Sequence, residues 1–379
     1  MAIKPDVKRR AERELPALRP HLKTMQPYPP GKPIEEVQRE YGLSDIVKLA
    51  SNENPIGPSP KAAKAMRDSA SEINRYPDGY AYALRHALAK FYGLQPDQFL
   101  FGNGSDEIFI LLALSFLSPS ENIVVSDLAF VRYQMAAQLV GAKWESVKMR
   151  DWRHDLPGFV RAIGPTTRMV CLSNPNNPVG TYVTRAELEA FLPKIPRNIL
   201  IILDEAYFEY SSAPDYPNGL DYLAAYPNLV VTRTFSKAYG LAGLRVGYAM
   251  GCAQLLADVE RVRPPFNVNL PAQRAAVAAL KDQTHVRRVA TLNRREMKFV
   301  TATLSKIGLR WIPSATNFVL IDTGLDGKEV TEKLLRRGVI VRPMGGYCLP
   351  RHIRVTFGTR RENQKFLKAL SEVLKEKIA

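Results

Sequence analysis

The sequence predicts an α/β fold with a mainly parallel central sheet flanked by helices, followed by a smaller α+β C-terminal domain. From Val47 onward, short β-branched or aliphatic runs alternate with helical patterns. Alternation of this kind favours a parallel sheet, because each helix crosses one face of the sheet to reach the next strand. Past about Pro271 the alternation gives way to long basic helices and a few short strands, which indicates the second domain.

We expect three parts along the chain: an N-terminal arm over residues 1–45, a large domain over 46–270 and a small domain over 271–379. The arm is rich in proline and weakly periodic, with one short helix expected from Ile34 to Tyr41. Arms of this kind often dock on a partner.

In the large domain, the strand candidates are aliphatic runs that end in polar residues, and the helix candidates carry apolar stripes or capping residues. Ser105, for example, is expected to cap a helix, because two acids and an apolar run follow it. The expected strands are Asn122 to Ser126, Met169 to Ser173, Ile199 to Asp204, Leu229 to Thr234 and Val246 to Met250, and the expected helices are Ala83 to Tyr92, Ser105 to Leu117 and Arg185 to Leu192.

The small domain is expected to contain short strands, one internal helix and a last amphipathic helix. The strands are placed at Asn317 to Ile321, Val339 to Arg342 and Ile353 to Phe357, and the internal helix at Lys328 to Arg337.

The composition of the 379 residues, 46% hydrophobic and 24% charged, is typical of a folded soluble protein. The longest apolar stretches, Ile108 to Leu117 and Ile199 to Leu203, fall short of the roughly 20 residues that span a bilayer. Met1 to Leu15 is too charged for a secretory signal, so we expect a cytoplasmic protein. The three cysteines are far apart and the five histidines include no pair one helical turn apart, so we expect free thiols and no metal site.

The net charge of +16, from 53 Lys and Arg against 37 Asp and Glu, favours anionic partners. The basic residues are spread along predicted helices and no nucleic-acid motif accompanies them, so we interpret them as solvated helix faces. Neither a nucleic-acid nor a membrane partner is expected.

Polar segments follow the predicted strands, where ligands bind in parallel α/β sheets. A further one, Gly102 to Glu107, precedes the apolar helix and has only two of the three glycines of a dinucleotide fingerprint. Such a turn before a helix N-terminus suits a single phosphate, although an ordinary helix cap is the simpler alternative. The segments after the strands are Asn174 to Gly180, Asp204 to Tyr207, Thr234 to Lys237 and Gly243 to Gly247.

These segments have a common chemical logic if the ligand is a pyridine aldehyde phosphate. The amine of Lys237 can condense with the aldehyde, and Asp204 can keep the pyridine nitrogen protonated so that the ring accepts electrons. Tyr207 can donate a hydrogen bond to the phenolic oxygen. Each residue alone has an ordinary explanation, as a surface lysine or a helix cap, and the argument lies in their co-occurrence. The phosphate can be held by Ser105, Thr234, Ser236 and Arg245.

From about Lys48 to the C-terminus, the chain resembles the fold-type I pyridoxal phosphate-dependent aminotransferases, and among them the histidinol-phosphate aminotransferases. The resemblance implies the fold of that family and pyridoxal 5'-phosphate as cofactor. It is carried by Leu49 to Pro55, Asn74 to Asp78, Gly102 to Glu107, Asn174 to Gly180, Asp204 to Tyr207, Thr234 to Lys237, Gly243 to Gly247, Asn317-Phe318 and Ile353 to Gly358.

The resemblance also assigns roles residue by residue. Lys237 matches the lysine that binds the cofactor aldehyde and later moves the substrate proton, and Asp204 matches the partner of the pyridine nitrogen. Asn177 and Tyr207 match the groups on the phenolic oxygen. Asp106 lies beside the phosphate and is interpreted as structural, because we expect the helix backbone and Ser105 to make the cofactor contact there. The phosphate cradle comprises Gly104, Ser105, Thr234, Ser236 and Arg245.

Phe130 falls where this family usually has a tyrosine stacked on the cofactor ring, and Tyr133 is a competing candidate for that position. Tyr76 matches a tyrosine that reaches the cofactor phosphate of the neighbouring subunit, which implies a homodimer with shared active sites. For the substrate, Arg354 matches the arginine that grips its acidic group, Arg342 resembles a second anion contact, and Tyr28 is expected to line the pocket.

The reaction implied by the resemblance is amino transfer between L-histidinol phosphate and 2-oxoglutarate, in histidine biosynthesis. The main alternative is an aromatic amino-acid (phenylalanine or tyrosine) aminotransferase, because both kinds of substrate offer a flat ring, an amine and an anion. A phosphothreonine decarboxylase is a third possibility. A regulator built on this fold would need an additional DNA-binding domain, and the roughly 45 residues before the resemblance are too few and too rich in proline for one.

Overall fold

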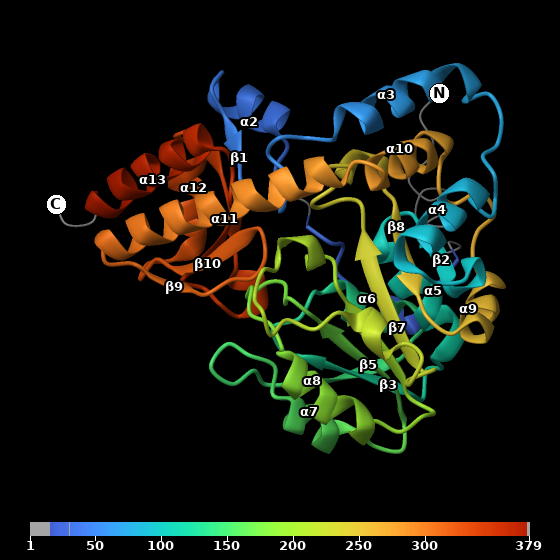
Figure 1. The fold of residues 1–379 in the computed structure, drawn as a ribbon. Coiled ribbons are helices and arrows are strands. Elements are labelled where there is room, and N and C mark those ends of the chain that lie inside the picture. Colours follow the sequence, from blue (N-terminus) through green and yellow to red (C-terminus); the bar gives the residue numbers. More distant parts are fainter. Residues whose placement is uncertain (1–15, 30, 377–379) are drawn as a thin grey trace, which may run out of the picture.

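The computed structural model describes residues 16–29 and 31–376, which form a large α/β part and a smaller part beside it (Figure 1). The large part is built on a seven-stranded sheet with the order β2-β8-β7-β6-β5-β3-β4. The five strands from β7 to β4 are parallel, whereas β8 runs antiparallel to both of its neighbours. The prediction of a mainly parallel sheet is therefore confirmed. The strands are β2 (Phe99–Gly102), β3 (Asn122–Ser126), β4 (Lys143–Val147), β5 (Thr167–Ser173), β6 (Leu200–Asp204), β7 (Leu229–Thr234) and β8 (Gly247–Met250).

Helices cover both faces of this sheet and enclose two apolar cores. One core includes side chains from α4, α7, α8 and α10, and the other includes side chains from α5, α6 and α9. Strands β5 to β8 are buried along almost their whole length, which explains their nearly continuous aliphatic sequences. The helices of the large part are α3 (Pro60–Asp68), α4 (Tyr82–Tyr92), α5 (Ser105–Phe116), α6 (Arg132–Leu139), α7 (Leu156–Ala162), α8 (Arg185–Phe191), α9 (Ala253–Glu260) and α10 (Leu270–Leu280).

The smaller part contains a four-stranded antiparallel sheet with the order β12-β13-β10-β9 and a two-stranded parallel pair of β1 and β11. Its apolar core lies between these strands and the helices α11 and α13. The elements are α2 (Ile34–Tyr41), β1 (Val47–Lys48), α11 (Gln283–Lys306), β9 (Arg310–Ile312), β10 (Phe318–Asp322), α12 (Gly327–Leu335), β11 (Val339–Ile340), β12 (Arg342–Pro343), β13 (His352–Thr356) and α13 (Arg360–Lys375).

The prediction of one strand from Val339 to Arg342 is wrong. Val339 and Ile340 pair with β1, whereas Arg342 and Pro343 pair with β13 in the other sheet. Each piece has only two residues, so the apolar run spans a change of sheet rather than a single strand. The change places Arg342 opposite Arg354 on the neighbouring strand.

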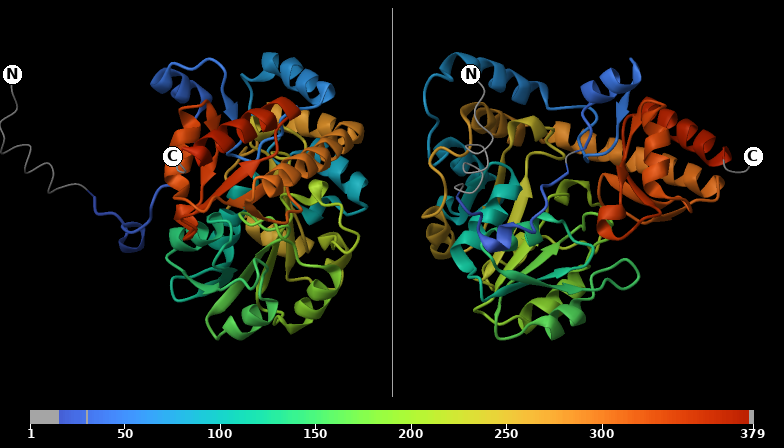
Figure 2. Two further views of the ribbon diagram at one scale, coloured as in Figure 1. Left: turned by 90° about the vertical axis from the view of Figure 1, so that its left-hand side faces the viewer. Right: turned by 180° about the vertical axis from the view of Figure 1, so that it is seen from behind.

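The long helix α11 joins the two parts: it follows α10, which packs against α3 and α4, and it packs against α13 (Figure 1). The described part of the arm crosses from the smaller part toward α6, where the Gln138 side chain donates a hydrogen bond to the His21 carbonyl at 3.4 Å (Figure 2). None of the described helices is long and apolar enough to cross a bilayer. The division of the chain at residues 45 and 270 remains a prediction.

Candidate active site

A cavity of about 260 Å³ lies at the carboxyl ends of β5, β6 and β7, facing the smaller part. Almost all of the candidate site residues lie on its wall, although they come from segments that are far apart in the sequence. These residues are Tyr28, Ser105, Asp106, Phe130, Asn177, Asp204, Tyr207, Thr234, Ser236, Lys237, Arg245, Arg342 and Arg354.

Three candidates lie off this wall: Gly104, Tyr76 and Tyr133. Gly104 lies behind it, with a φ of 79° and its Cα against Arg245; a Cβ at this position would come 2.3 Å from the Arg245 Nη2 atom. The Arg245 side chain could move aside, but a φ of 79° with a ψ of 168° is a backbone conformation that essentially only glycine adopts, so glycine is required here. Tyr76 lies outside the cavity, is 83% exposed and stacks on Phe266 with ring centroids 4.7 Å apart.

Lys237 follows β7 and places its amine in the cavity, where Nζ donates a hydrogen bond to the Ser51 carbonyl at 3.3 Å. Burial lowers the pKa of Lys237 to about 8, and the positive charge of Arg354 contributes to the shift. Because the neutral amine is the nucleophile, the lowered pKa makes a larger fraction of Lys237 reactive near neutral pH.

Asp204 ends β6 and is held on both carboxylate oxygens. Its Oδ2 atom accepts a hydrogen bond from the Tyr133 hydroxyl at 2.5 Å, and its Oδ1 atom accepts from the Thr232 hydroxyl at 3.0 Å and the Ala206 N–H at 3.2 Å. Burial raises the pKa of Asp204 to about 6, although these hydrogen bonds oppose the shift. Tyr133 therefore lies behind Asp204, and Phe130 is the aromatic ring of this pair on the cavity wall.

The raised pKa of Asp204 predicts a pH-dependent stability for the protein without ligand. Since the folded-state pKa of about 6 lies above the unfolded value of 3.8, this group stabilises the fold at low pH, and the contribution is lost as pH rises through about 6. Asp204→Asn removes that dependence. We expect the free energy of unfolding of the variant, relative to that of wild type, to increase by up to about 3 kcal/mol as pH rises from about 4 to about 7. Urea unfolding at each pH measures this difference. A difference that stays constant with pH would contradict the burial of an ionisable group here.

Asn52 is a site residue that was not assigned a role from the sequence. It is 2% exposed, and its Nδ2 atom donates a hydrogen bond to the Tyr207 hydroxyl at 2.8 Å. Its own backbone and side chain are held by Thr356 and Asn317 from the smaller part. Asn52 therefore orients the Tyr207 hydroxyl, which it contacts across 155 residues of sequence. The sequence did contain a signal for Asn52, because it lies in Leu49 to Pro55, one of the segments that carry the family resemblance.

Arg354, Arg342 and Tyr28 lie together at the side of the cavity nearest the smaller part and the arm. Arg354 donates to the Asn177 Oδ1 atom at 2.5 Å and to the Ala50 carbonyl at 3.1 Å. Its buried Nε atom has no partner among the described residues. The Arg342 guanidinium lies over the Tyr28 ring, 5.6 Å from the centroid. Two guanidinium groups in one wall suit a ligand that carries a carboxylate or a phosphate.

A second cationic region lies at the N-terminus of α5. Arg245 donates to the Ser236 hydroxyl at 3.2 Å, and the Thr234 hydroxyl accepts from the Ser236 N–H at 3.0 Å. The expectation that Ser105 caps the helix is wrong: Gly104 is the N-cap, and because it has no side chain, no side-chain cap bond forms. The first N–H groups of the helix therefore remain available, and together with Arg245 and the hydroxyls they form a site for an anion.

Comparison with known proteins gives a consistent result. Residues 44–370 match the family described as aminotransferase class I and II. The chain is 48% identical to histidinol-phosphate aminotransferase 2 of Pseudomonas fluorescens, and the match covers 94% of this chain and 96% of that protein. It is 46% identical to histidinol-phosphate aminotransferase of Moorella thermoacetica, with 95% of this chain and 94% of that protein covered. The crystal structure of histidinol-phosphate aminotransferase from Sinorhizobium meliloti, in complex with pyridoxal-5'-phosphate, has a TM-score of 0.88 at 29% identity and covers 96% of this chain and 98% of that one.

Proposed function

The chain belongs to the class I and II aminotransferases, and from this premise we propose that it transfers an amino group between L-histidinol phosphate and 2-oxoglutarate, with pyridoxal 5'-phosphate as cofactor, in histidine biosynthesis. The observation that carries the proposal is its identity of 46 to 48% to histidinol-phosphate aminotransferases over nearly the whole chain. The relatives reported above do not favour an aromatic amino-acid aminotransferase.

The residues of the cavity fit this cofactor group by group. Its phosphate suits the anion site formed by Arg245, Ser236 and the glycine turn before α5. Its pyridine nitrogen suits the buried carboxylate of Asp204, and its aldehyde suits the amine of Lys237 with its lowered pKa. Its phenolic oxygen suits the Tyr207 hydroxyl, with Asn177 nearby on the same wall.

When bound, the cofactor supplies an electron sink for the carbon that bears the substrate amine. Lys237 would hold the aldehyde until the substrate amine displaces it, and its freed amine would then carry the proton from that carbon. Asp204 would keep the pyridine nitrogen protonated by placing a carboxylate beside it. Hydrogen bonds from Tyr133, Thr232 and Ala206 would hold that carboxylate in position. Phe130 would cover the ring.

Arg354 and Arg342 would hold the anionic end of each substrate in turn, with Tyr28 beside them. A guanidinium binds phosphate and carboxylate in the same two-point manner, so one site can serve both histidinol phosphate and 2-oxoglutarate. The net charge of +16 would favour the approach of both anions.

A single half-reaction tests the proposed function. Purified protein loaded with pyridoxal 5'-phosphate is mixed separately with L-histidinol phosphate and with L-phenylalanine, while the visible absorbance of the bound cofactor is followed. We expect rapid loss of the band with histidinol phosphate and slow loss with phenylalanine. The reverse order would favour the aromatic amino-acid alternative, and a protein that binds no cofactor would contradict the enzyme class.

We also propose a homodimer in which Tyr76 reaches the cofactor phosphate of the partner subunit. Tyr76 and Phe266 form an exposed aromatic stack, and Ile73, Tyr80 and Tyr82 are further large hydrophobic residues exposed in the same stretch of chain. Exposed apolar groups of this kind are typical of an interaction surface. A cytoplasmic location is proposed on the similarity to histidinol-phosphate aminotransferases, whose names describe enzymes of small-molecule metabolism.

Mixing two inactive variants tests the shared site. Lys237→Ala and Tyr76→Ala each damage every site of their own dimers, but a mixed dimer contains one site with an intact Lys237 and an intact Tyr76 from the other subunit. We expect activity to appear when the two are unfolded and refolded together, and not when each is refolded alone. Mixtures no more active than the separate proteins would show that Tyr76 does not act across subunits.

A further inference from the structure

The first turn of α5 carries two acids beside the proposed phosphate site, and their carboxylates lie in different places. Asp106 lies on the cavity wall, with Oδ2 3.7 Å from the Arg245 Nη2 atom. Glu107 is absent from that wall, and its Oε2 atom accepts hydrogen bonds from the Asn103 N–H and the Asn267 Nδ2 atom, both at 2.6 Å. An acid this close to a phosphate site repels the ligand, so the position of Glu107 calls for a second explanation.

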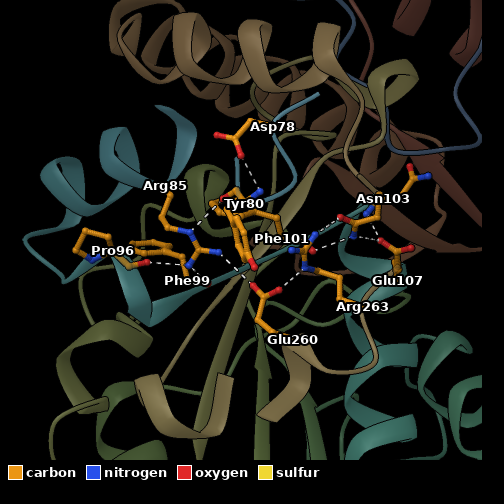
Figure 3. A network of polar contacts seen from close by, with 11 residues as sticks. Asp78, Tyr80, Arg85, Pro96, Phe99, Phe101, Asn103, Glu107, Glu260 and Arg263 are labelled. Atoms are coloured by element: carbon orange, nitrogen blue, oxygen red, sulfur yellow. Dashed lines mark hydrogen bonds and ion pairs between the residues drawn. The ribbon is translucent and has the colours of Figure 1, made fainter. Parts of the chain in front are cut away.

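The contacts of Glu107 continue into a chain of polar groups that reaches Arg85 on α4 (Figure 3). The Asn267 Nδ2 atom also donates to the Phe101 carbonyl on β2 at 3.1 Å, and its Oδ1 atom accepts from Arg263 at 2.8 Å. Arg263 in turn donates to Glu260, which also accepts from Arg85. Through Asn267, Glu107 therefore connects the turn before α5 to β2 and to the segment that follows α9.

The turn that Glu107 holds, Gly102 to Gly104, has little conformational preference of its own because two of its three residues are glycines. A Cβ on Gly102 would lie 2.7 Å from the Ile108 Cγ1 atom and 2.8 Å from the Gly104 carbonyl oxygen, and Gly104 has a φ of 79° that favours glycine. Both positions thus require glycine, and the glycines leave the turn to be fixed from outside. Glu107 supplies that restraint at the Asn103 N–H, between the two glycines.

We propose that Glu107 is a positioning residue for the cofactor phosphate. By fixing the turn from Gly102 to Gly104, it keeps the free N–H groups at the start of α5 and the Arg245 guanidinium directed at one point. This inference rests on the proposed function, since it takes pyridoxal 5'-phosphate as the ligand. It assigns Glu107 a favourable effect on phosphate binding, opposite in sign to the effect of its charge alone.

The test compares dissociation constants of the cofactor-free protein for pyridoxal 5'-phosphate and for pyridoxal, which lacks the phosphate. Glu107→Ala removes the hydrogen bond from the Asn103 N–H in the turn and the one from Asn267. We expect about tenfold weaker binding of pyridoxal 5'-phosphate, the effect of one charge-assisted hydrogen bond. Pyridoxal binding should stay within about twofold of wild type. Glu107→Gln keeps an acceptor oxygen and should recover most of the affinity.

Glu121→Ala is the matched control. Glu121 also accepts a backbone N–H, from Ser118 at 2.8 Å, and pairs with Arg168 at 2.7 Å, but it lies outside the cavity wall. Its loss should change neither constant. If Glu107→Ala does not fold, Asn267→Ala is measured in the same way, and we again expect weaker binding of the phosphorylated compound alone.

The inference is overturned if Glu107→Ala binds pyridoxal 5'-phosphate as tightly as wild type or more tightly, since only a repulsive charge would then have been removed. Equal weakening of both compounds also overturns it, because the effect would be general to the fold. Wild-type protein that binds neither compound would overturn the proposed function together with this inference. Wild-type binding with an unaffected Glu107→Ala overturns the inference alone.

Discussion

Lys237→Ala is expected to lower the rate of amino transfer from L-histidinol phosphate to 2-oxoglutarate by about 10⁴-fold or more. The variant loses both the amine that binds the cofactor and the group that moves the proton. Its effect should be on turnover, measured as product formed under saturating substrate, because Arg354 and Arg342 still hold the substrate anion.

Lys48→Ala serves as the control for Lys237→Ala. Lys48 is a partly exposed lysine of the smaller part that pairs with Glu53 at 2.9 Å and does not lie on the cavity wall. Its substitution should leave the rate near that of wild type. A Lys237→Ala protein that turned over like wild type would contradict the assigned role.

Arg233→Met is expected to lower the free energy of unfolding by about 3–5 kcal/mol, the usual effect of breaking a buried ion pair from one side. Arg233 and Glu205 are 1% and 0% exposed, with two hydrogen bonds to the Glu205 Oε2 atom at 2.9 and 2.7 Å. The guanidinium also lies 3.4 Å from the centroid of the Phe208 ring. Without Arg233, the buried Glu205 carboxylate has no opposite charge. Denaturant unfolding of the cofactor-free protein measures the loss.

The pH dependence and two further variants test this explanation. Burial raises the pKa of Glu205, and Arg233 opposes that shift. The loss in free energy of unfolding caused by Arg233→Met should therefore be smaller at low pH, where Glu205 is protonated and needs no opposite charge. Glu205→Leu combined with Arg233→Met should recover part of the stability. Arg185→Met, which breaks the exposed pair with Asp221, should have little effect. If Arg233→Met lowered the free energy of unfolding as little as Arg185→Met, the buried ion pair would not be important for stability.

Most strands buried on both faces were predicted from the sequence, although β2, which is buried at all four residues, was missed. The predicted ranges Asn122 to Ser126 and Leu229 to Thr234 coincide with β3 and β7. The edge strand β4 was missed, because four of its five residues are exposed and its sequence has no apolar run. The segment Val339 to Arg342 was misassigned for the opposite reason, since its continuous apolar run hides a change of sheet.

The placement of the site residues around one cavity agrees with their expected positions after the strands, because the carboxyl ends of parallel strands meet at one edge of the sheet. What the sequence could not supply is the set of contacts between segments that are distant in the chain. The bond from Tyr133 to Asp204 spans 71 residues and that from Asn52 to Tyr207 spans 155. No local spacing reveals such pairs, so the contact of Tyr133 with Asp204 could not be predicted.

The covalent attachment of the cofactor tests the central claim most directly. Protein loaded with pyridoxal 5'-phosphate is treated with borohydride, which makes the link between the lysine and the cofactor aldehyde permanent, and the modified peptide is identified by mass spectrometry. We predict a single modified residue, Lys237, with the label lost in Lys237→Ala. Labelling of another lysine, or of none, would contradict the assignment of this cavity as the active site.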